Sequence, residues 1–124
     1  MSNKKLEIFL HGFHLGTLSY DRKNDLYTYN SDLKEEEKFK AKFHYELEDY
    51  DLWGSKNLQS KQIPAVFGMD VANIKIRSDI LKGLKLPEKP VAFDYLYELG
   101  KFKQDDKFMT YKSIENQKNW EIFS

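Results

Sequence analysis

The chain opens with the run Leu6-Glu7-Ile8-Phe9-Leu10-His11-Gly12-Phe13-His14-Leu15-Gly16-Thr17-Leu18. Apolar residues recur at every second position on both sides of His11-Gly12. Such alternation is typical of a half-buried β-strand, and a two-residue connection that contains glycine is typical of a hairpin turn. The run therefore predicts a β-hairpin and an antiparallel start to the fold.

Two later segments also have strand character. Leu26-Tyr27-Thr28-Tyr29 follows the polar turn cluster 21–25 and predicts a third strand of a meander. The segment from Phe39 to Leu47 alternates strictly between apolar and polar residues, which predicts a strand with one face on the core. Before it, the charged run 31–38 is interpreted as a solvated connector, in which Asp32 and Glu35 can cap a turn or two of helix.

Helical signals are concentrated in the second half of the chain. An apolar insertion from Ile63 to Met69 predicts a buried turn or a short helix starting at Pro64. Ser78 is placed to cap a short helix over 79–85. A second helix is expected over 90–100, with Gly100 in the left-handed conformation as its terminator, and Lys107 to Tyr111 is expected to form the last strand.

Together these patterns predict an α+β fold. We expect a small antiparallel meander sheet that begins with a β-hairpin, and two short helices in the C-terminal half. Residues 1–112 form a single domain in this interpretation. Residues 113–124 form a polar C-terminal tail that either docks or frays.

The composition limits the classes of function. Lys and Arg total 20, as do Asp and Glu, so the chain lacks the excess positive charge by which proteins bind nucleic acid or anionic membranes. The sequence has no cysteine, no signal peptide and no apolar run approaching the ~20 residues that span a bilayer. We expect a cytoplasmic protein that does not contact membranes.

Candidate catalytic groups are sparse. The histidines at 11, 14 and 44 are interpreted as structural, and the acidic pairs at 48–51 and 105–106 as solvated turn residues. The sequence contains no glycine-rich phosphate loop, nucleophile elbow or zinc-protease helix. We therefore expect no enzymatic activity, no cofactor and no metal.

Several segments, in order, resemble the N-terminal subdomain of HipA-type serine/threonine kinases. Leu15-Gly16-Thr17-Leu18 is similar to the return strand of that family's opening hairpin. The segment 93–100, Phe-Asp-Tyr-Leu-Tyr-Glu-Leu-Gly, is similar to its later helix with a terminal glycine, and 77–82 to the short helix before it. The family's ATP loop, catalytic Asp and magnesium ligands have no counterpart here, so the resemblance implies no phosphoryl transfer.

A stand-alone subdomain of this kind is similar to the HipS-like proteins of split HipBST toxin–antitoxin systems. The resemblance implies a non-enzymatic module that binds and restrains a HipA/HipT-like kinase. Trp is enriched at binding hot spots, and a Trp within a polar loop is a candidate anchor. The expected partner-binding residues are Asp49, Asp51, Leu52, Trp53 and Gly54.

Two alternatives remain open at this point. Trp53 can instead fold back into its own core. The chain can also be a small nucleic-acid-binding or phage-type inhibitor protein, in which Phe9, Phe13, Tyr20, Tyr27 and Tyr29 form an aromatic sheet face that stacks bases. Direct nucleic-acid binding is the less favoured of these, because few Lys and Arg residues lie between the rings.

Overall fold

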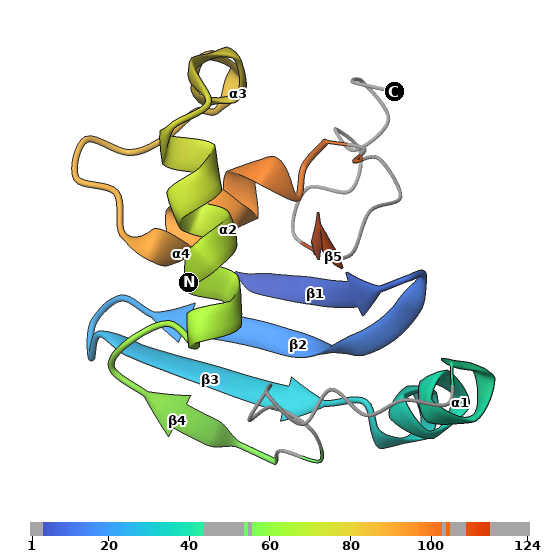
Figure 1. Cartoon of the computed structure of the whole chain (residues 1–124). Coiled ribbons are helices and arrows are strands. Elements are labelled where there is room, and N and C mark those ends of the chain that lie inside the picture. Colours follow the sequence, from blue (N-terminus) through green and yellow to red (C-terminus); the bar gives the residue numbers. More distant parts are fainter. Residues whose placement is uncertain (1–3, 44–53, 55, 103, 105–108, 115–124) are drawn as a thin grey trace.

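The computed structural model describes residues 4–43, 54, 56–102, 104 and 109–114. These residues form an antiparallel sheet with helices, which confirms the predicted α+β class (Figure 1). The strand order in the sheet is β4-β3-β2-β1-β5. The strands are β1 (Lys5–Leu10), β2 (Phe13–Asp21), β3 (Leu26–Ser31), β4 (Leu58–Ser60) and β5 (Met109–Ser113).

The opening hairpin and the meander are confirmed. β1 pairs with β2, with Leu6 opposite Leu18, and β2 pairs with β3. His11 and Gly12 connect the first two strands with φ values of 50° and 85°. Two consecutive positive φ values are the requirement of the hairpin turn whose twist matches that of the strands, which explains the glycine at position 12.

The predicted strand from Phe39 to Leu47 is wrong over the residues that the structure describes. Helix α1 (Leu33–Phe43) occupies this segment and also the charged run that was interpreted as a connector. The side chain of Asp32 caps it, since the Glu35 N–H donates to Asp32 Oδ1 at 3.2 Å. Because the segment is rich in Lys and Glu, its helix propensity prevails over a pattern that alternates in sequence. Phe39 and Glu36, three positions apart, are buried in this helix.

Three further helices lie in the described second half of the chain. They are α2 (Ala65–Lys75), α3 (Ser78–Gly83) and α4 (Ala92–Leu99). The expected short helix after Pro64 exists but continues to Lys75. Ser78 does not cap α3 as predicted: Arg77 is the N-cap residue, and no side chain bonds there.

The main core lies between the sheet and one layer formed by α2 and α4 (Figure 1). Leu6, Ile8 and Leu18 of the sheet and Phe67 and Leu96 of the helices are fully buried. Helix α1 packs elsewhere, at the end of the strands where the hairpin turns. There the rings of His11 and Phe13 lie against Phe39.

Gly100 ends α4 for a different reason from the one predicted. Its φ is −67°, a right-handed helical value, so it is not a left-handed terminator. A Cβ at this position would lie 2.6 Å from Ser113 Oγ and 2.9 Å from Ser113 N. The glycine therefore allows the end of α4 to approach β5, where Ser113 N–H donates to the Gly100 carbonyl at 3.0 Å.

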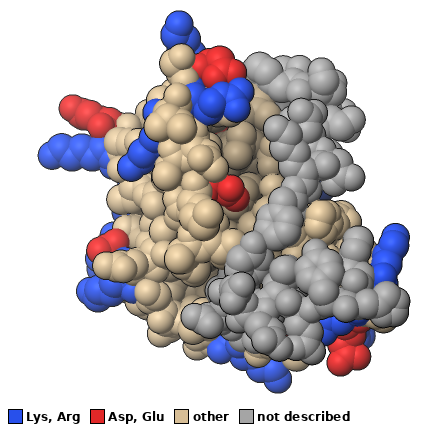
Figure 2. Space-filling view, viewed as in Figure 1, with Lys and Arg blue, Asp and Glu red and all other residues tan. Residues whose placement is uncertain are grey.

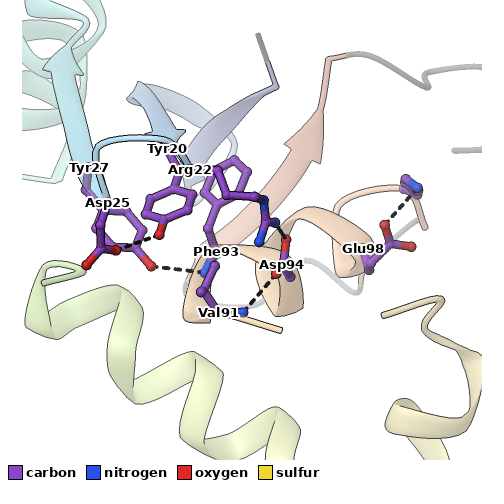
Figure 3. A network of polar contacts seen from close by, with 9 residues as sticks. Tyr20, Arg22, Asp25, Tyr27, Val91, Phe93, Asp94 and Glu98 are labelled. Atoms are coloured by element: carbon purple, nitrogen blue, oxygen red, sulfur yellow. Dashed lines mark hydrogen bonds and ion pairs between the residues drawn. The ribbon is translucent and has the colours of Figure 1, made fainter. Parts of the chain in front are cut away.

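Polar contacts tie the turn between β2 and β3 to the start of α4 (Figure 3). Asp94 Oδ2 accepts the Val91 N–H at 2.8 Å, which caps the helix, and Asp94 Oδ1 lies 2.5 Å from an Arg22 nitrogen. The Phe93 N–H donates to the Tyr27 hydroxyl at 3.3 Å. These bonds fix the position of α4 over the sheet.

The outer edge of β5 is closed by a side chain. The Tyr111 N–H donates to Gln104 Oε1 at 2.8 Å, and Gln104 Nε2 donates to the Tyr111 carbonyl at 2.7 Å. At the opposite edge of the sheet, all three residues of β4 are exposed. The main-chain groups of Tyr111 are therefore already bonded at the β5 edge, whereas the β4 edge is exposed.

Candidate functional site

Helix α2 supplies the most unusual surface among the described residues. Pro64 precedes the helix, and its carbonyl accepts the N–H groups of Phe67 and Gly68, both at 3.0 Å. Phe67, Val71 and Ile74 form the inward side and are at most 4% exposed. Their spacing of four and three residues is that of one helix face packed on the core.

The opposite side of α2 is also uncharged. We define the outer α2 face by the five exposed residues on the side opposite Phe67, Val71 and Ile74, which are Ala65, Met69, Ala72, Asn73 and Ile76. Met69 is 68% exposed and Ile76 is 79% exposed. Figure 2 shows a broad area of uncharged residues on this side of the molecule, interrupted by an acidic side chain, with basic and acidic side chains at its margin.

A surface helix usually carries charged residues on its solvent side, whereas that side of α2 carries only small, apolar and amide side chains. Large exposed apolar residues gathered in one area are typical of interaction sites. The outer α2 face combines both properties. It is therefore the best candidate for a contact with another protein chain.

The charged residues of α2 are directed away from this face. Asp70 is partly buried and accepts a hydrogen bond from the Tyr111 hydroxyl, and burial raises the pKa of its carboxyl. Lys75 Nζ lies 5.2 Å from the centroid of the Tyr95 ring on α4. Just after the helix, an Arg77 nitrogen lies 3.1 Å from Asp79 Oδ2. These contacts leave the outer α2 face free of charge.

Most of the predicted partner-binding segment lies outside the described residues: Asp49, Asp51, Leu52 and Trp53 belong to 44–53. Gly54 is described and exposed, with φ at 67°. Its N–H donates to both carboxylate oxygens of Glu36, at 3.0 and 3.3 Å. The predicted segment therefore ends beside α1, away from the outer α2 face (Figure 1).

A second polar cluster joins the first two strands to α1. His14 Nδ1 lies 2.7 Å from Asp32 Oδ2, and His14 Nε2 contacts Glu7 Oε2. The hydrogen bond with His14 lowers the pKa of Asp32. Each ring nitrogen thus lies beside a carboxylate, and Asp32 also caps α1. The cluster holds α1 on the hairpin, in agreement with a structural interpretation of His14; His44 lies outside the described residues.

The described part of the chain gives no sign of a metal site, a membrane-spanning helix or a base-stacking platform at Tyr27 and Tyr29. No group of three or more His, Asp or Glu side chains within it is arranged to hold a metal ion. No helix in this part has the length and apolar character needed to cross a bilayer. Tyr27 and Tyr29 are 5% and 1% exposed, so neither ring is available to stack bases.

Comparison with known proteins assigns neither a family nor a function to the chain. No family model, curated protein or solved structure matches the chain. The resemblance to the HipA-type subdomain thus rests on the sequence segments quoted above.

The predicted segment from Ile63 to Met69 does not include Ala72, Asn73 and Ile76, so it does not predict the outer α2 face. The signal is present, however. Two interleaved sets of uncharged residues continue to Ile76, one at 67, 71 and 74 and the other at 65, 69, 72, 73 and 76. Each set has helical spacing, which indicates a helix with two uncharged sides.

Proposed function

We propose that the chain is a non-enzymatic interaction module that binds and restrains a HipA/HipT-like kinase. The main evidence that the chain binds another protein is the outer α2 face. Met69 and Ile76 are exposed there, although the other side of the helix already packs on the core. The kinase as partner rests on the sequence resemblance. The predicted segment Asp49 to Gly54, held at its end by Glu36, is a second contact in this proposal.

The burial of Tyr27 and Tyr29 favours a protein partner over nucleic acid. An aromatic platform for bases requires exposed rings interleaved with cationic side chains. These two tyrosines instead form part of the core, where Tyr29 lies against Phe67.

Co-expression with a HipA-type kinase encoded by a neighbouring gene tests the proposal. We expect the tagged chain to retain the kinase and to reduce the rate at which it phosphorylates itself. Met69→Glu places a charge in the outer α2 face and should weaken retention at least tenfold. Leu33→Glu is the matched control, because Leu33 is an exposed apolar residue on α1. A chain that neither retains the kinase nor changes its activity would refute the proposed function.

A further inference from the structure

His14 of β2 lies between two carboxylates that belong to different elements. Its Nδ1 is 2.7 Å from Oδ2 of Asp32, the residue that caps α1, and its Nε2 contacts Oε2 of Glu7 on β1. Phe9 is paired with His14 across the two strands, and the centroids of their rings lie 5.3 Å apart. We call Glu7, His14 and Asp32 the His14 cluster. It joins the first two strands to the start of α1.

A neutral imidazole does not fit well between two carboxylates. It has one N–H and one nitrogen with a lone pair, and a carboxylate offers only acceptors. With the proton on Nδ1, the lone pair of Nε2 would face Glu7, where this nitrogen is buried without a regular hydrogen bond. With the proton on Nε2, the lone pair of Nδ1 would face Asp32 at 2.7 Å. The imidazolium cation, in contrast, is attracted by both carboxylates.

We propose that the His14 cluster is a proton-dependent latch, which holds α1 on the hairpin when the ring is a cation and loosens when the ring loses one proton. A neutral ring can still donate to one carboxylate, but it then repels the other, so one of the two contacts is lost. The hydrogen bond with His14 lowers the pKa of Asp32, which keeps this group a carboxylate in the latch. Imidazole ordinarily changes its charge between about pH 5 and about pH 8, so the latch loosens as the pH rises through this range.

The elements around the His14 cluster also carry charged side chains. They are Lys112 of β5, which is paired with Glu7 across the strands, and Glu35, Glu36 and Lys38 of α1. Lys38 is itself bonded to Glu35 at 2.9 Å. Carboxyl groups ordinarily change charge below about pH 5 and ammonium groups above about pH 9. A change at this cluster between those limits is therefore assigned to the imidazole.

The latch acts on a helix that packs on the sheet at the hairpin turn. There the ring of Phe39 lies against the rings of His11 and Phe13. Glu36 of the same helix accepts the N–H of Gly54, the described end of the predicted partner-binding segment. Loosening of the latch therefore reaches that end of the segment through α1. Any effect on kinase binding rests on the proposed function, whereas the latch itself does not.

Nuclear magnetic resonance of the isotope-labelled full chain, without any partner, follows the ring and the helix in one titration. Long-range proton–nitrogen spectra distinguish the imidazolium ring from both neutral tautomers, and His14→Gln assigns the His14 signals. The three side chains of the cluster are 25–30% exposed, so water screens their attraction in part. As the ring loses its proton between about pH 5.5 and about pH 8.5, the hydrogen-exchange protection of the α1 amides should fall at least about threefold. The α4 amides, in the main core, should keep their protection.

Glu7→Gln tests the second carboxylate with little change in size. Because one attraction is lost, the His14 ring should release its proton at a lower pH in this variant than in the parent. Glu37→Gln is the matched control, since Glu37 is an exposed residue of α1, and its His14 ring should titrate as in the parent. In His14→Gln the protection of α1 should no longer depend on pH in this range. A ring that titrates identically in the parent and Glu7→Gln, or α1 protection that stays constant while the ring loses its proton, would overturn the inference.

The proposed function and the latch can fail separately. A chain that neither retains nor restrains the kinase removes the proposed function, and the titration of α1 still decides the latch. A chain that retains the kinase, but whose α1 protection does not follow the His14 ring, removes the latch and leaves the proposed function.

Discussion

Arg22 and Asp94 are separated by 72 positions, yet an Arg22 nitrogen lies 2.5 Å from Asp94 Oδ1. The Arg22 side chain is 55% exposed, whereas that of Asp94 is 7% exposed and also accepts the Val91 N–H. The carboxylate therefore has two roles, one as the cap of α4 and one as the partner of a surface cation. Mutation can separate these roles.

We expect Asp94→Ala to lower the free energy of unfolding by about 1–2 kcal/mol, because the cap of α4 is lost. Arg22→Ala should cost less than about 1 kcal/mol, since one partner of that pair is solvated. The double variant should be no less stable than Asp94→Ala alone. Urea unfolding of the three variants measures these values. Equal losses for the two single variants would contradict the separation of roles.

Asp32 gives a pH dependence in the acid range. The hydrogen bond with His14 lowers its pKa in the folded chain below the ordinary 3.8. The bond therefore stabilises the fold above about pH 4, and this contribution is lost as the pH falls through the folded-state pKa. Asn caps helices as well as Asp does, so Asp32→Asn should lose less stability than the parent between about pH 5 and pH 2.5. Urea unfolding curves across that pH range measure the difference. Asp32→Ala also lacks the helix cap, so its free energy of unfolding at neutral pH should be lower by about 1 kcal/mol.

Titration of Asp70 should change the stability of the fold with pH in the opposite direction to titration of Asp32. Burial raises its pKa in the folded chain, so its contribution to stability is most favourable at low pH and declines as the pH rises through the folded-state pKa. Asp70→Asn retains an oxygen that can accept the Tyr111 hydroxyl. This variant should be more stable than the parent at pH 7 and no more stable at about pH 3. The exposed Asp79, whose pKa Arg77 lowers, provides the control: Asp79→Asn should give no gain at pH 7.

Two glycines in or beside helices should respond oppositely to alanine. A Cβ at Gly100 would lie under 3 Å from two atoms of Ser113, whereas a Cβ at Gly68 would lie 3.6 Å from Ile63 Cγ2. Gly100→Ala should therefore cost about 1–3 kcal/mol, and Gly68→Ala should gain about 0.5–1 kcal/mol. Thermal unfolding of both variants checks the signs. A stabilising Gly100→Ala would mean that the contact with β5 is looser than described.

The elements that the sequence predicts correctly are those with agreeing local signals. Alternation, a glycine turn and β-branched or aromatic residues all indicate the same structure from Lys5 to Tyr29, and the meander is confirmed. In the segment around Phe39 the signals conflict, because alternation indicates a strand and the high content of Lys and Glu indicates a helix. The helix forms because the Asp32 cap and the Glu35–Lys38 pair support it.

Other features depend on contacts between distant segments. The sequence around Gly100 indicates a helix end, but the close approach to Ser113 depends on the position of β5. The outer α2 face could be predicted as an uncharged stripe from the residues at 65, 69, 72, 73 and 76. The exposure of this face could not be predicted from the sequence, because it depends on which side of α2 the sheet covers.

The contact of Gln104 with both main-chain groups of Tyr111 has a consequence for aggregation. A growing fibril needs two open strand edges on every copy, one to add to and one to present to the next copy. At the described β5 edge, the Gln104 amide already occupies the place of the next strand at Tyr111, and the Gly100 carbonyl takes the Ser113 N–H. Pairing through β4 can therefore join two sheets into one larger sheet, and the growth stops there.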